Sequence, residues 1–300
     1  MRCLLLLLAA GLVAPASGAD AQDSPTLERI RQTGVITLGY RDASIPFSYL
    51  DDKQRPIGYS MELCLRIADA AKARLQLDDL LIKLTSVTSA TRIAMVANRT
   101  VDLECGTTTN TIGRQERVAF AVTTFIAASR FVAKRASALR TFDDLRGKTV
   151  VSTAGTTSIR RLVELTAARG LGMKIVAGRD HADAFRMVET DRASAFVMDD
   201  VLLYGLVASS RDPERYDVAG EPLSVEPYGI ALQKDDPVFK KLADDTLVSL
   251  FRSGEIHRIY RRWFQSPIPP RQINLNLPMG AALSKAIVKP TDSGDPAAYE

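Results

Sequence analysis

The sequence has little histidine and little cysteine, and this scarcity removes several kinds of active site. Among its 300 residues there are two histidines, His181 and His257, and three cysteines. Two histidines so far apart in the chain are too few for a metal centre with the usual ligand spacing. Cys105 has no histidine near it in the sequence, and no GxSxG motif presents a serine nucleophile. We therefore expect no metal, no other cofactor and no catalytic residues.

The sequence also lacks a phosphate-binding loop and a strongly basic segment. Gly147-Lys148-Thr149 resembles the end of such a loop, but Phe142 stands where the motif needs glycine. A strand pattern then follows where the motif needs a helix. The formal net charge of +4 comes from 39 basic and 35 acidic residues, without a long lysine or arginine tract. Such a mild excess argues against nucleic acid as a partner.

Only the N-terminus contains a concentrated apolar run. Residues 4–13 are apolar, Arg2 precedes them, and small residues follow through Ala21, which is the pattern of a secretory signal peptide. The run is too short to span a bilayer, and no other segment approaches that length. We expect a signal peptide of 1–21, with cleavage after Ala21 favoured over cleavage after Gly18, and a soluble protein exported to the periplasm.

Apolar runs that are typical of strands alternate with helical patterns along the chain. The expected strands are 35–39, 80–85, 101–105, 130–134, 148–152, 173–177, 194–198 and 228–232. The expected helices lie near 60–74, 90–98, 114–119, 157–169, 180–190, 200–208, 236–252 and 255–263. This alternation predicts an α/β architecture with mostly parallel sheets.

Two polar loops follow expected strands and precede expected helices. The first, ECGTTTNTIGRQER at 104–117, combines hydroxyl and amide side chains with Arg114; the second is STAGTTS at 152–158. Hydroxyls, the N–H groups of a helix N-terminus and a guanidinium all bind carboxylates. Each loop alone could be an ordinary turn, in which Thr156 or Thr157 only caps a helix. Because ligands bind at the carboxyl ends of strands in open α/β sheets, the pair predicts two lobes facing one ligand.

Several segments resemble the periplasmic solute-binding proteins of polar amino acid ABC transporters (solute-binding protein family 3), and within them the acidic amino acid branch. The matching segments are GVITLGYRDASIPFSY (34–49), VTSATRI (87–93), ECGTTTN (104–110), STAGTTS (152–158), RDHADAFR (179–186), AFVMDD (195–200), YGIALQKDDPVFKKL (228–242) and WFQSPIPP (263–270). They occur in family order, and ECGTTTN, DHADAFR and WFQSPIPP are fairly specific to that branch. The resemblance implies a two-lobe type II periplasmic-binding fold with a mostly parallel sheet in each lobe.

The resemblance also implies a discontinuous division of the chain. The implied parts are a lobe 1 of 24–122 and 228–272, a lobe 2 of 123–227 and a C-terminal tail of 273–300. Two hinge crossings, near 121–128 and 222–229, would join the lobes, and Pro222 and Pro227 suit a stiff extended crossing. We expect the tail to wrap over the surface and to fray after about Lys289.

An acidic amino acid carries two carboxylates and one ammonium group, so a selective site needs at least two guanidinium-like partners and one carboxylate. The resemblance implies nine ligand-binding residues: Arg41, Ser89, Arg92, Thr107, Thr109 and Arg114 of lobe 1, and Thr157, His181 and Asp199 of lobe 2. Asp199 would bind the ammonium group. His181 would lie at the side-chain end of the ligand, where a protonated imidazole would add favourable charge near pH 6 to 7. Thr107 departs from the serine expected in close relatives but keeps the hydroxyl.

Most of these residues also have an ordinary structural interpretation. An isolated arginine or histidine in a loop is usually solvated. Ser89 could cap the helix that carries Arg92, and the pair Asp199-Asp200 is typical of a helix N-cap. Likewise, Cys64 and Cys105 could form a disulfide in an oxidising periplasm, but Cys64 lies on an apolar stripe that suits a buried thiol equally well.

These observations predict a periplasmic receptor that closes on L-glutamate or L-aspartate and delivers it to an ABC permease in the inner membrane. We expect a monomer that makes and breaks no bond. One alternative is a binding protein for another amino acid, such as glutamine, asparagine or a basic one. The other is an enzyme on the same fold, a cyclohexadienyl dehydratase acting on prephenate or arogenate. The sequence does not rank glutamate against aspartate, because one methylene is worth only about 1–3 kcal/mol in a pocket.

Overall fold

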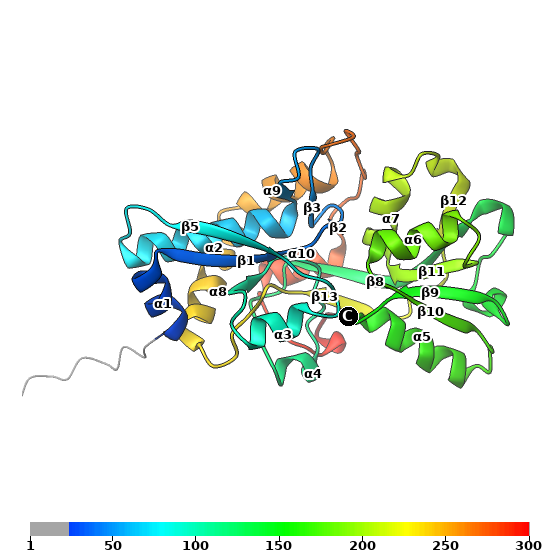
Figure 1. Ribbon diagram of the computed structural model, residues 1–300, viewed down its shortest axis with the longest axis horizontal. Coiled ribbons are helices and arrows are strands. Elements are labelled where there is room, and N and C mark those ends of the chain that lie inside the picture. The colour runs from blue at the N-terminus through cyan, green and yellow to red at the C-terminus, as the bar shows by residue number, and fades with distance from the viewer. Residues whose placement is uncertain (1–23, 300) are drawn as a thin grey trace, which may run out of the picture.

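Two lobes lie next to each other along the longest axis of the molecule, joined by extended segments (Figure 1). The computed structural model describes residues 24–299, and the expected signal peptide at 1–21 lies outside the described residues. Within this range, no helix combines the length and the hydropathy needed to cross a membrane.

The first lobe is built on a five-stranded sheet with the order β5-β1-β6-β14-β7. Its strands are β1 (Val35–Tyr40), β5 (Leu81–Ser86), β6 (Leu103–Glu104), β7 (Ala119–Phe120) and β14 (Ala231–Leu232). β5, β1 and β6 run parallel, whereas β14 is antiparallel to both its neighbours. The helices of this lobe are α1 (Pro25–Thr33), α2 (Tyr59–Leu75), α3 (Arg92–Ala97), α4 (Ile112–Gln115), α8 (Pro237–Arg252) and α9 (Glu255–Phe264). A small antiparallel sheet, β2 (Ala43–Ser44), β3 (Ser48–Leu50) and β4 (Pro56–Ile57), lies beside them.

The second lobe is built on a six-stranded sheet whose main order is β10-β9-β11-β8-β12. Its strands are β8 (Phe125–Lys134), β9 (Thr149–Thr153), β10 (Lys174–Gly178), β11 (Ala195–Asp199), β12 (Tyr216–Ala219) and β13 (Val225–Tyr228). β10, β9 and β11 are parallel, and β8 is antiparallel to β11, β12 and β13. Helices α5 (Thr157–Ala168), α6 (His181–Glu189) and α7 (Asp200–Ser209) pack against this sheet (Figure 1). The short 3-10 helices are η1 (Arg135–Ser137), η2 (Phe142–Leu145) and η3 (Pro213–Arg215). The parallel centre of each sheet confirms the predicted α/β architecture.

The lobes are connected by β8 and β13, which pair antiparallel and lie side by side between them (Figure 1). In this pairing Phe125 is opposite Tyr228. Both rings belong to a buried aromatic cluster with Phe47 and Phe264 of the first lobe; the Phe125 centroid is 4.8 Å from that of Phe47 and 5.1 Å from that of Phe264. The cluster fixes one end of the crossing in the first lobe, because edge and stacked ring contacts add to the area that they bury.

Side-chain caps explain where the helices of the second lobe begin. Thr156 accepts a hydrogen bond from the N–H of Ile159 at 3.2 Å and donates one to the carbonyl of Thr153 at 2.7 Å. Asp180 accepts one from the N–H of Asp183 at 2.8 Å and so starts α6. Both caps satisfy N–H groups that the first turn of a helix leaves without a partner. They place Thr157 and His181 in the first turn of their helices, facing the first lobe.

Cys64 of α2 and Cys105, which follows β6, form a disulfide. The sequence left a disulfide and a buried thiol as equal alternatives, and the structure decides for the disulfide. The bond ties the polar loop that begins at Glu104 to the longest helix of the first lobe. The loop is thereby anchored at its first residues.

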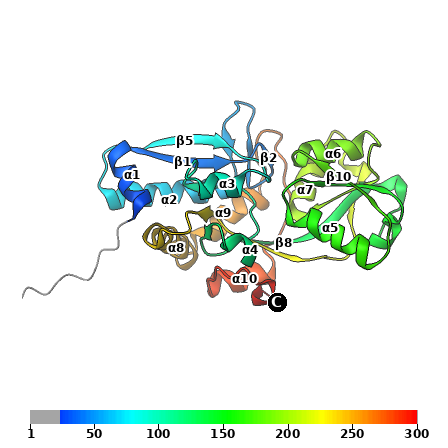
Figure 2. The ribbon, with the colours of Figure 1, turned by 60° about the horizontal axis from the view of Figure 1, so that its bottom comes forward.

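The C-terminal tail lies beneath the crossing between the lobes (Figure 2). It contains α10 (Ala281–Val288), which packs against α8, and the 3-10 helix η4 (Pro296–Tyr299). The carbonyl of Thr291 accepts a hydrogen bond from the N–H of Thr123 at 2.8 Å, and the hydroxyls of Thr123 and Tyr299 are 2.7 Å apart. The expected fraying after Lys289 is therefore wrong, because the last residues bond to the hinge and bury the Tyr299 ring.

The helix expected at 114–119 is also wrong in position. α4 spans Ile112–Gln115, because Thr111 caps it by accepting a hydrogen bond from the N–H of Arg114 at 3.2 Å. The chain then enters β7 at Ala119. α1, α10 and the small sheet β2-β3-β4 were not predicted.

Candidate functional site

The carboxyl ends of the parallel strands in the two lobes face each other, and the predicted ligand residues lie at these ends. Arg41 follows β1, the polar loop follows β6, and Asp199 ends β11. Eight of the nine predicted residues are buried: Arg41, Ser89, Arg92, Thr107, Thr109, Thr157, His181 and Asp199. Arg114 is half-buried. The structure therefore gathers these side chains between the lobes rather than leaving them in solvent.

Three contacts join predicted residues of the first lobe to the second lobe. Arg41 Nη2 is 3.4 Å from His181 Nε2, Arg114 Nη2 donates to the carbonyl of Gly155 at 3.2 Å, and the hydroxyls of Thr109 and Thr157 are 3.5 Å apart. Contacts of this length across the interface mean that the lobes are closed on each other in this structure.

Gly155 allows this close approach of the lobes. Its φ is +76°, and a Cβ on it would lie 2.6 Å from the Cα of Ala90 and 2.8 Å from the carbonyl oxygen of Ser89. A glycine is required both by the left-handed backbone and by the neighbouring chain of the first lobe.

One end of the site is cationic and only partly satisfied. Among the described residues, Arg41 Nη1, Arg92 Nε and Ser89 Oγ are buried without a hydrogen-bond partner. Arg92 Nη1 donates to the carbonyl of Thr107 at 2.8 Å. Burial and, after it, the charge of Arg92 lower the pKa of Arg41 to about 10. Buried donors without acceptors are costly, so this end favours an anion.

Ser89 does not cap the neighbouring helix, contrary to the alternative suggested by the sequence. The N-cap of α3 is Thr91, whose hydroxyl lies 3.0 Å from that of Thr88. The hydroxyl of Ser89 is therefore left at the cationic end.

Arg114 contacts both lobes from the edge of the site. Its Nη1 donates to the carbonyl of Thr109 at 2.7 Å, and its Nη2 donates to the second lobe at Gly155. Its pKa is lowered to about 9 by burial and then by the charges of Arg92 and Arg160, while Glu226 and Glu104 oppose the change. A guanidinium in this position can pair with a carboxylate through its planar fork.

His181 is neutral in this structure, which differs from the protonated imidazole considered from the sequence. Burial, followed by the charges of Arg41 and Arg92, holds its pKa well below the usual value. Its Nδ1 lies 2.9 Å from the hydroxyl of Thr153. Because a guanidinium can only donate, Nε2 faces Arg41 as an acceptor and the proton resides on Nδ1.

The opposite end of the site is acidic and buried. Asp199 is 1% exposed and accepts hydrogen bonds from the hydroxyls of Ser158, at 3.1 Å, and Tyr228. Burial and, after it, the charge of Glu226 raise the pKa of Asp199 to about 8. Asp199 occupies the N-cap position of α7 without capping it. Asp200 instead accepts from the N–H groups of Val201 at 2.8 Å and Ala128 at 3.2 Å.

Two further carboxylates at the site were not predicted. Glu226 of β13 is 2% exposed and accepts hydrogen bonds from Thr157 Oγ1, at 2.7 Å, and from Ser224. Glu104 accepts one from Thr108 at 2.6 Å, and its Oε1 is buried without a partner. Glu104 lies in the polar loop that the sequence singled out. Glu226 lies in the expected hinge, where no local pattern signals burial.

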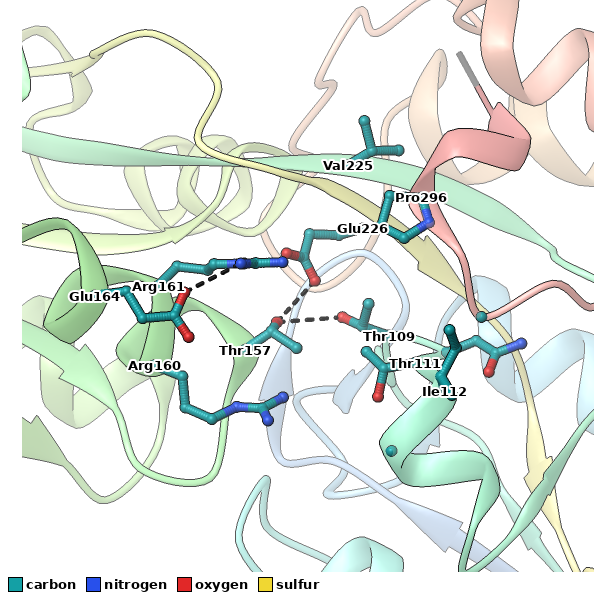
Figure 3. Close-up of a pocket in the computed structure, with 13 residues that line it drawn as sticks. Thr109, Thr111, Ile112, Thr157, Arg160, Arg161, Glu164, Val225, Glu226 and Pro296 are labelled. Atoms are coloured by element: carbon teal, nitrogen blue, oxygen red, sulfur yellow. Dashed lines mark hydrogen bonds and ion pairs between the residues drawn. The ribbon is translucent and has the colours of Figure 1, made fainter. Parts of the chain in front are cut away.

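A groove opens beside the site on the side of the C-terminal tail (Figure 3). It encloses a cavity of about 270 Å³. Its walls come from α4, α5, β13 and the tail, and the residues shared with the site are Thr109, Thr157 and Glu226. Figure 3 shows Thr157 between Glu226 and Thr109 at the inner end of this groove.

The arrangement of charge suits a small dipolar ligand with additional negative charge. Arg41, Arg92 and Arg114 supply forked donors, and Asp199 supplies a carboxylate at the other end. No cluster of three or more histidine, cysteine, aspartate or glutamate side chains that could hold a metal ion occurs in the described part of the chain.

The chain is similar to several known proteins. The sequence profile of the bacterial extracellular solute-binding proteins, family 3, matches residues 36–266. The chain is 48% identical over 268 residues to the L-glutamate/L-aspartate-binding protein of Pseudomonas aeruginosa, covering 89% of each chain. It is 42% identical over 289 residues to the glutamate/aspartate import solute-binding protein of Salmonella typhimurium, covering 96% of this chain and 95% of that protein. A crystal structure of a mutant of ArgBP from T. maritima matches with a TM-score of 0.69 and 26% identity, covering 80% of this chain and 99% of that chain.

Proposed function

Because the chain belongs to the bacterial extracellular solute-binding proteins of family 3, we propose that it is a periplasmic receptor for L-glutamate and L-aspartate. Its two lobes close on the amino acid, and the closed protein delivers it to an ABC permease in the inner membrane. The relatives from Pseudomonas aeruginosa and Salmonella typhimurium are named for these two ligands, and they are binding proteins rather than enzymes, which supports a role without catalysis.

The observation that carries the proposal is the cationic end of the site. Arg41 Nη1, Arg92 Nε and Ser89 Oγ are buried donors that no described residue satisfies. A carboxylate has two oxygens that together accept about four hydrogen bonds. The side-chain carboxylate of glutamate or aspartate would therefore bind here, with His181 beside it.

The other groups of the ligand have partners in the rest of the site. Arg114 and Thr109 at one edge and the backbone N–H of Thr157 at the N-terminus of α5 suit the α-carboxylate end, because the helix dipole and the guanidinium both favour an anion. Asp199 suits the ammonium group. Since the proposed contacts come from both lobes, binding favours the closed state by its differential affinity.

We also propose where and in what form the protein acts. Loss of residues 1–21 on export would leave a monomer in the periplasm, divided at the crossings near 121–128 and 222–229. The pairing of β8 with β13 supports this position of the hinge.

A calorimetric titration of ligand-stripped protein with the twenty amino acids tests the proposal. We expect binding of glutamate and aspartate, and much weaker binding of glutamine. The glutamine amide presents N–H donors to arginine donors, and losing two charged hydrogen bonds costs about 3–6 kcal/mol, or about two to four decades in affinity. If glutamine bound within about five-fold of glutamate, the assignment to acidic amino acids would be wrong. Incubation with prephenate should give no phenylpyruvate.

A further inference from the structure

We infer that Glu226 is a positioning residue of the ligand site. It orients the hydroxyl of Thr157 so that the oxygen of this hydroxyl can accept a hydrogen bond from the ammonium group of the ligand. The inference rests on the proposed function, since it concerns recognition of an amino acid. Glu226 is outside the nine residues predicted to touch the ligand, and its effect is exerted through one of them.

The contacts of Glu226 place it behind Thr157 as seen from the first lobe. Glu226 Oε2 accepts the hydroxyl hydrogen of Thr157 at 2.7 Å, and Ser224 donates to the other oxygen. On the far side of Thr157, the hydroxyl of Thr109 lies 3.5 Å from Thr157 Oγ1 (Figure 3). Thr157 thus stands between a hinge carboxylate and the opposite lobe.

The direction of this hydrogen bond determines what Thr157 can offer a ligand. A threonine hydroxyl has one hydrogen and two lone pairs. The hydrogen of Thr157 is engaged by the carboxylate of Glu226, so only lone pairs are left for other partners. An ammonium group carries donors and no acceptor, so it can donate a hydrogen bond to the oxygen of Thr157 in this state. A carboxylate oxygen has no hydrogen to donate, so it cannot bind the same oxygen.

The contact between Glu226 and Thr157 is not needed to start the helix. Thr156 already caps α5 through the N–H of Ile159. Glu226 is also 69 residues from Thr157 in the sequence and belongs to the hinge strand. Among the described residues Glu226 forms no ion pair, although the charge of Arg114 acts on it, and a buried carboxylate that receives its hydrogen bonds from hydroxyl groups alone is costly. The ammonium group of the ligand would supply an opposite charge to Glu226 and to Asp199 together.

The test is a double-mutant cycle measured with L-glutamate by calorimetry on the full mature protein. Glu226→Gln removes the charge, and Thr157→Val removes the hydroxyl while it keeps the shape. Each single variant should weaken glutamate binding at least about ten-fold. Because both changes act through one hydroxyl, the double variant should bind within about three-fold of the weaker single variant.

The matched control and the comparison ligand separate this role from a structural one. Glu164→Gln alters an exposed residue of α5 that lines the same groove and pairs with Arg161 at 3.1 Å, and it should leave the affinity for glutamate within about two-fold. L-2-hydroxyglutarate carries a hydroxyl in place of the ammonium group. Its affinity should change less than about three-fold in Glu226→Gln, so the ratio of the affinities for glutamate and 2-hydroxyglutarate should become smaller in this variant.

Two results would overturn the inference. The first is a loss of glutamate affinity in the double variant that equals the product of the losses in the two single variants. The second is an equal loss of affinity for glutamate and for 2-hydroxyglutarate in Glu226→Gln. Either result would mean that Glu226 only packs the hinge. If Glu226→Gln did not fold, Thr157→Ser against Thr157→Val would decide, since only the serine variant keeps the hydroxyl and should keep the affinity. If 2-hydroxyglutarate bound too weakly to measure, the cycle with glutamate would decide. Failure of the wild-type protein to bind glutamate would instead refute the proposed function.

Discussion

The cationic and acidic side chains of the site are held in different ways. Arg41 and Arg92 are buried close enough for the charge of each to act on the other, and burial lowers the pKa of Arg41 to about 10. Asp199 is stabilised by hydroxyl groups, and burial raises its pKa to about 8. Each end of the site is thus electrostatically unfavourable alone, and a ligand with charges of both signs relieves both.

Replacement of a buried arginine should reduce affinity and selectivity together. In Arg92→Ala the side-chain carboxylate of the bound glutamate loses charged hydrogen bonds from the protein, each worth about 1.5–3 kcal/mol. Glutamate binding should weaken at least about ten-fold, and the difference between the affinities for glutamate and glutamine should become smaller. Calorimetry measures both ligands. The exposed Arg117 is the matched control, and Arg117→Ala should leave both affinities unchanged. If Arg92→Ala kept the same ratio of glutamate to glutamine affinity as the wild-type protein, the role of Arg92 would be contradicted.

The pKa of Asp199 predicts how affinity depends on pH. Below pH 8 the ligand-free carboxyl is mainly protonated, because burial and the charges of Glu226 and Asp200 raise its pKa, although Tyr228 and Ser158 donate to it. An ammonium group needs the anion and lowers that pKa, so binding releases a proton. Glutamate affinity should therefore rise by up to about ten-fold per pH unit from pH 6 towards pH 8.

Calorimetry in buffers of different ionisation enthalpy measures the number of protons released. Asp199→Asn should abolish the release and weaken binding. Proton uptake by His181 would have the opposite sign, since its ligand-free pKa lies well below its usual value. Net uptake of protons at pH 7 would therefore contradict the assigned role of Asp199.

The elements that carry the site are short loops anchored at one end. The polar loop after β6 is tied to α2 by the disulfide of Cys64 and Cys105. In the second lobe, the turn between β9 and α5 is fixed by the cap of Thr156 and by Gly155. Anchored loops lose little conformational entropy when a ligand binds, which favours affinity.

Alanine at Gly155 should impair closure more than it impairs folding. The added Cβ would meet the backbone of the first lobe at 2.6 Å only when the lobes are closed. Glutamate binding should weaken at least about ten-fold, with a loss of stability of about 1–2 kcal/mol from the left-handed backbone. Gly172→Ala is the control, because Gly172 has a φ of +57° and open space around it. Equal affinities of the two variants, measured by calorimetry beside thermal melting, would contradict this prediction.

The whole molecule is two lobes joined by a pair of strands, with the tail laid across the junction. The tail contacts the polar loop as well as the hinge, because the side chain of Asn110 donates to the carbonyl of Asp292 at 2.7 Å. The last residues therefore connect the two crossings, the first lobe and the groove beside the site.

Ligand binding should make the molecule more compact in solution. The structure shows the closed arrangement, with Arg41 next to His181 and Thr109 next to Thr157. Without ligand, the unsatisfied arginines favour opening to water. Small-angle scattering should show a smaller radius of gyration with saturating glutamate than without it, and identical curves would count against closure.

Removal of the tail after Lys289 should destabilise the protein. The truncation deletes the contacts of Thr291, Asp292 and Tyr299 with the hinge and the polar loop. Each lost hydrogen bond costs about 1 kcal/mol, and each kcal/mol lowers the melting temperature of a large domain by about 2–4 °C. Differential scanning calorimetry should show a large decrease of the melting temperature for the truncated protein. For Tyr299→Phe, which loses only the hydroxyl, the decrease should be small. An unchanged melting temperature after truncation would mean that the tail does not brace the hinge.

The sequence by itself determined the positions of the central strands and main helices, because apolar periodicity is a local property of the chain. The strands near Val35, Thr149 and Ala195 and the helices near Tyr59 and Thr157 follow their predicted positions closely. The resemblance of its motifs pointed to family 3, which the profile match confirms. The roles of the nine site residues stay predictions, although the structure brings them together.

Only the tertiary structure decided which groups are paired and which are charged. The disulfide of Cys64 and Cys105, the burial of Glu226 against Thr157 and the ordered end at Tyr299 all join residues far apart in the sequence. The neutral state of His181 depends on its burial between the lobes and then on two arginines of the other lobe. No local pattern contains this information, because hydrogen bonding and desolvation act between groups that only the folded chain brings together.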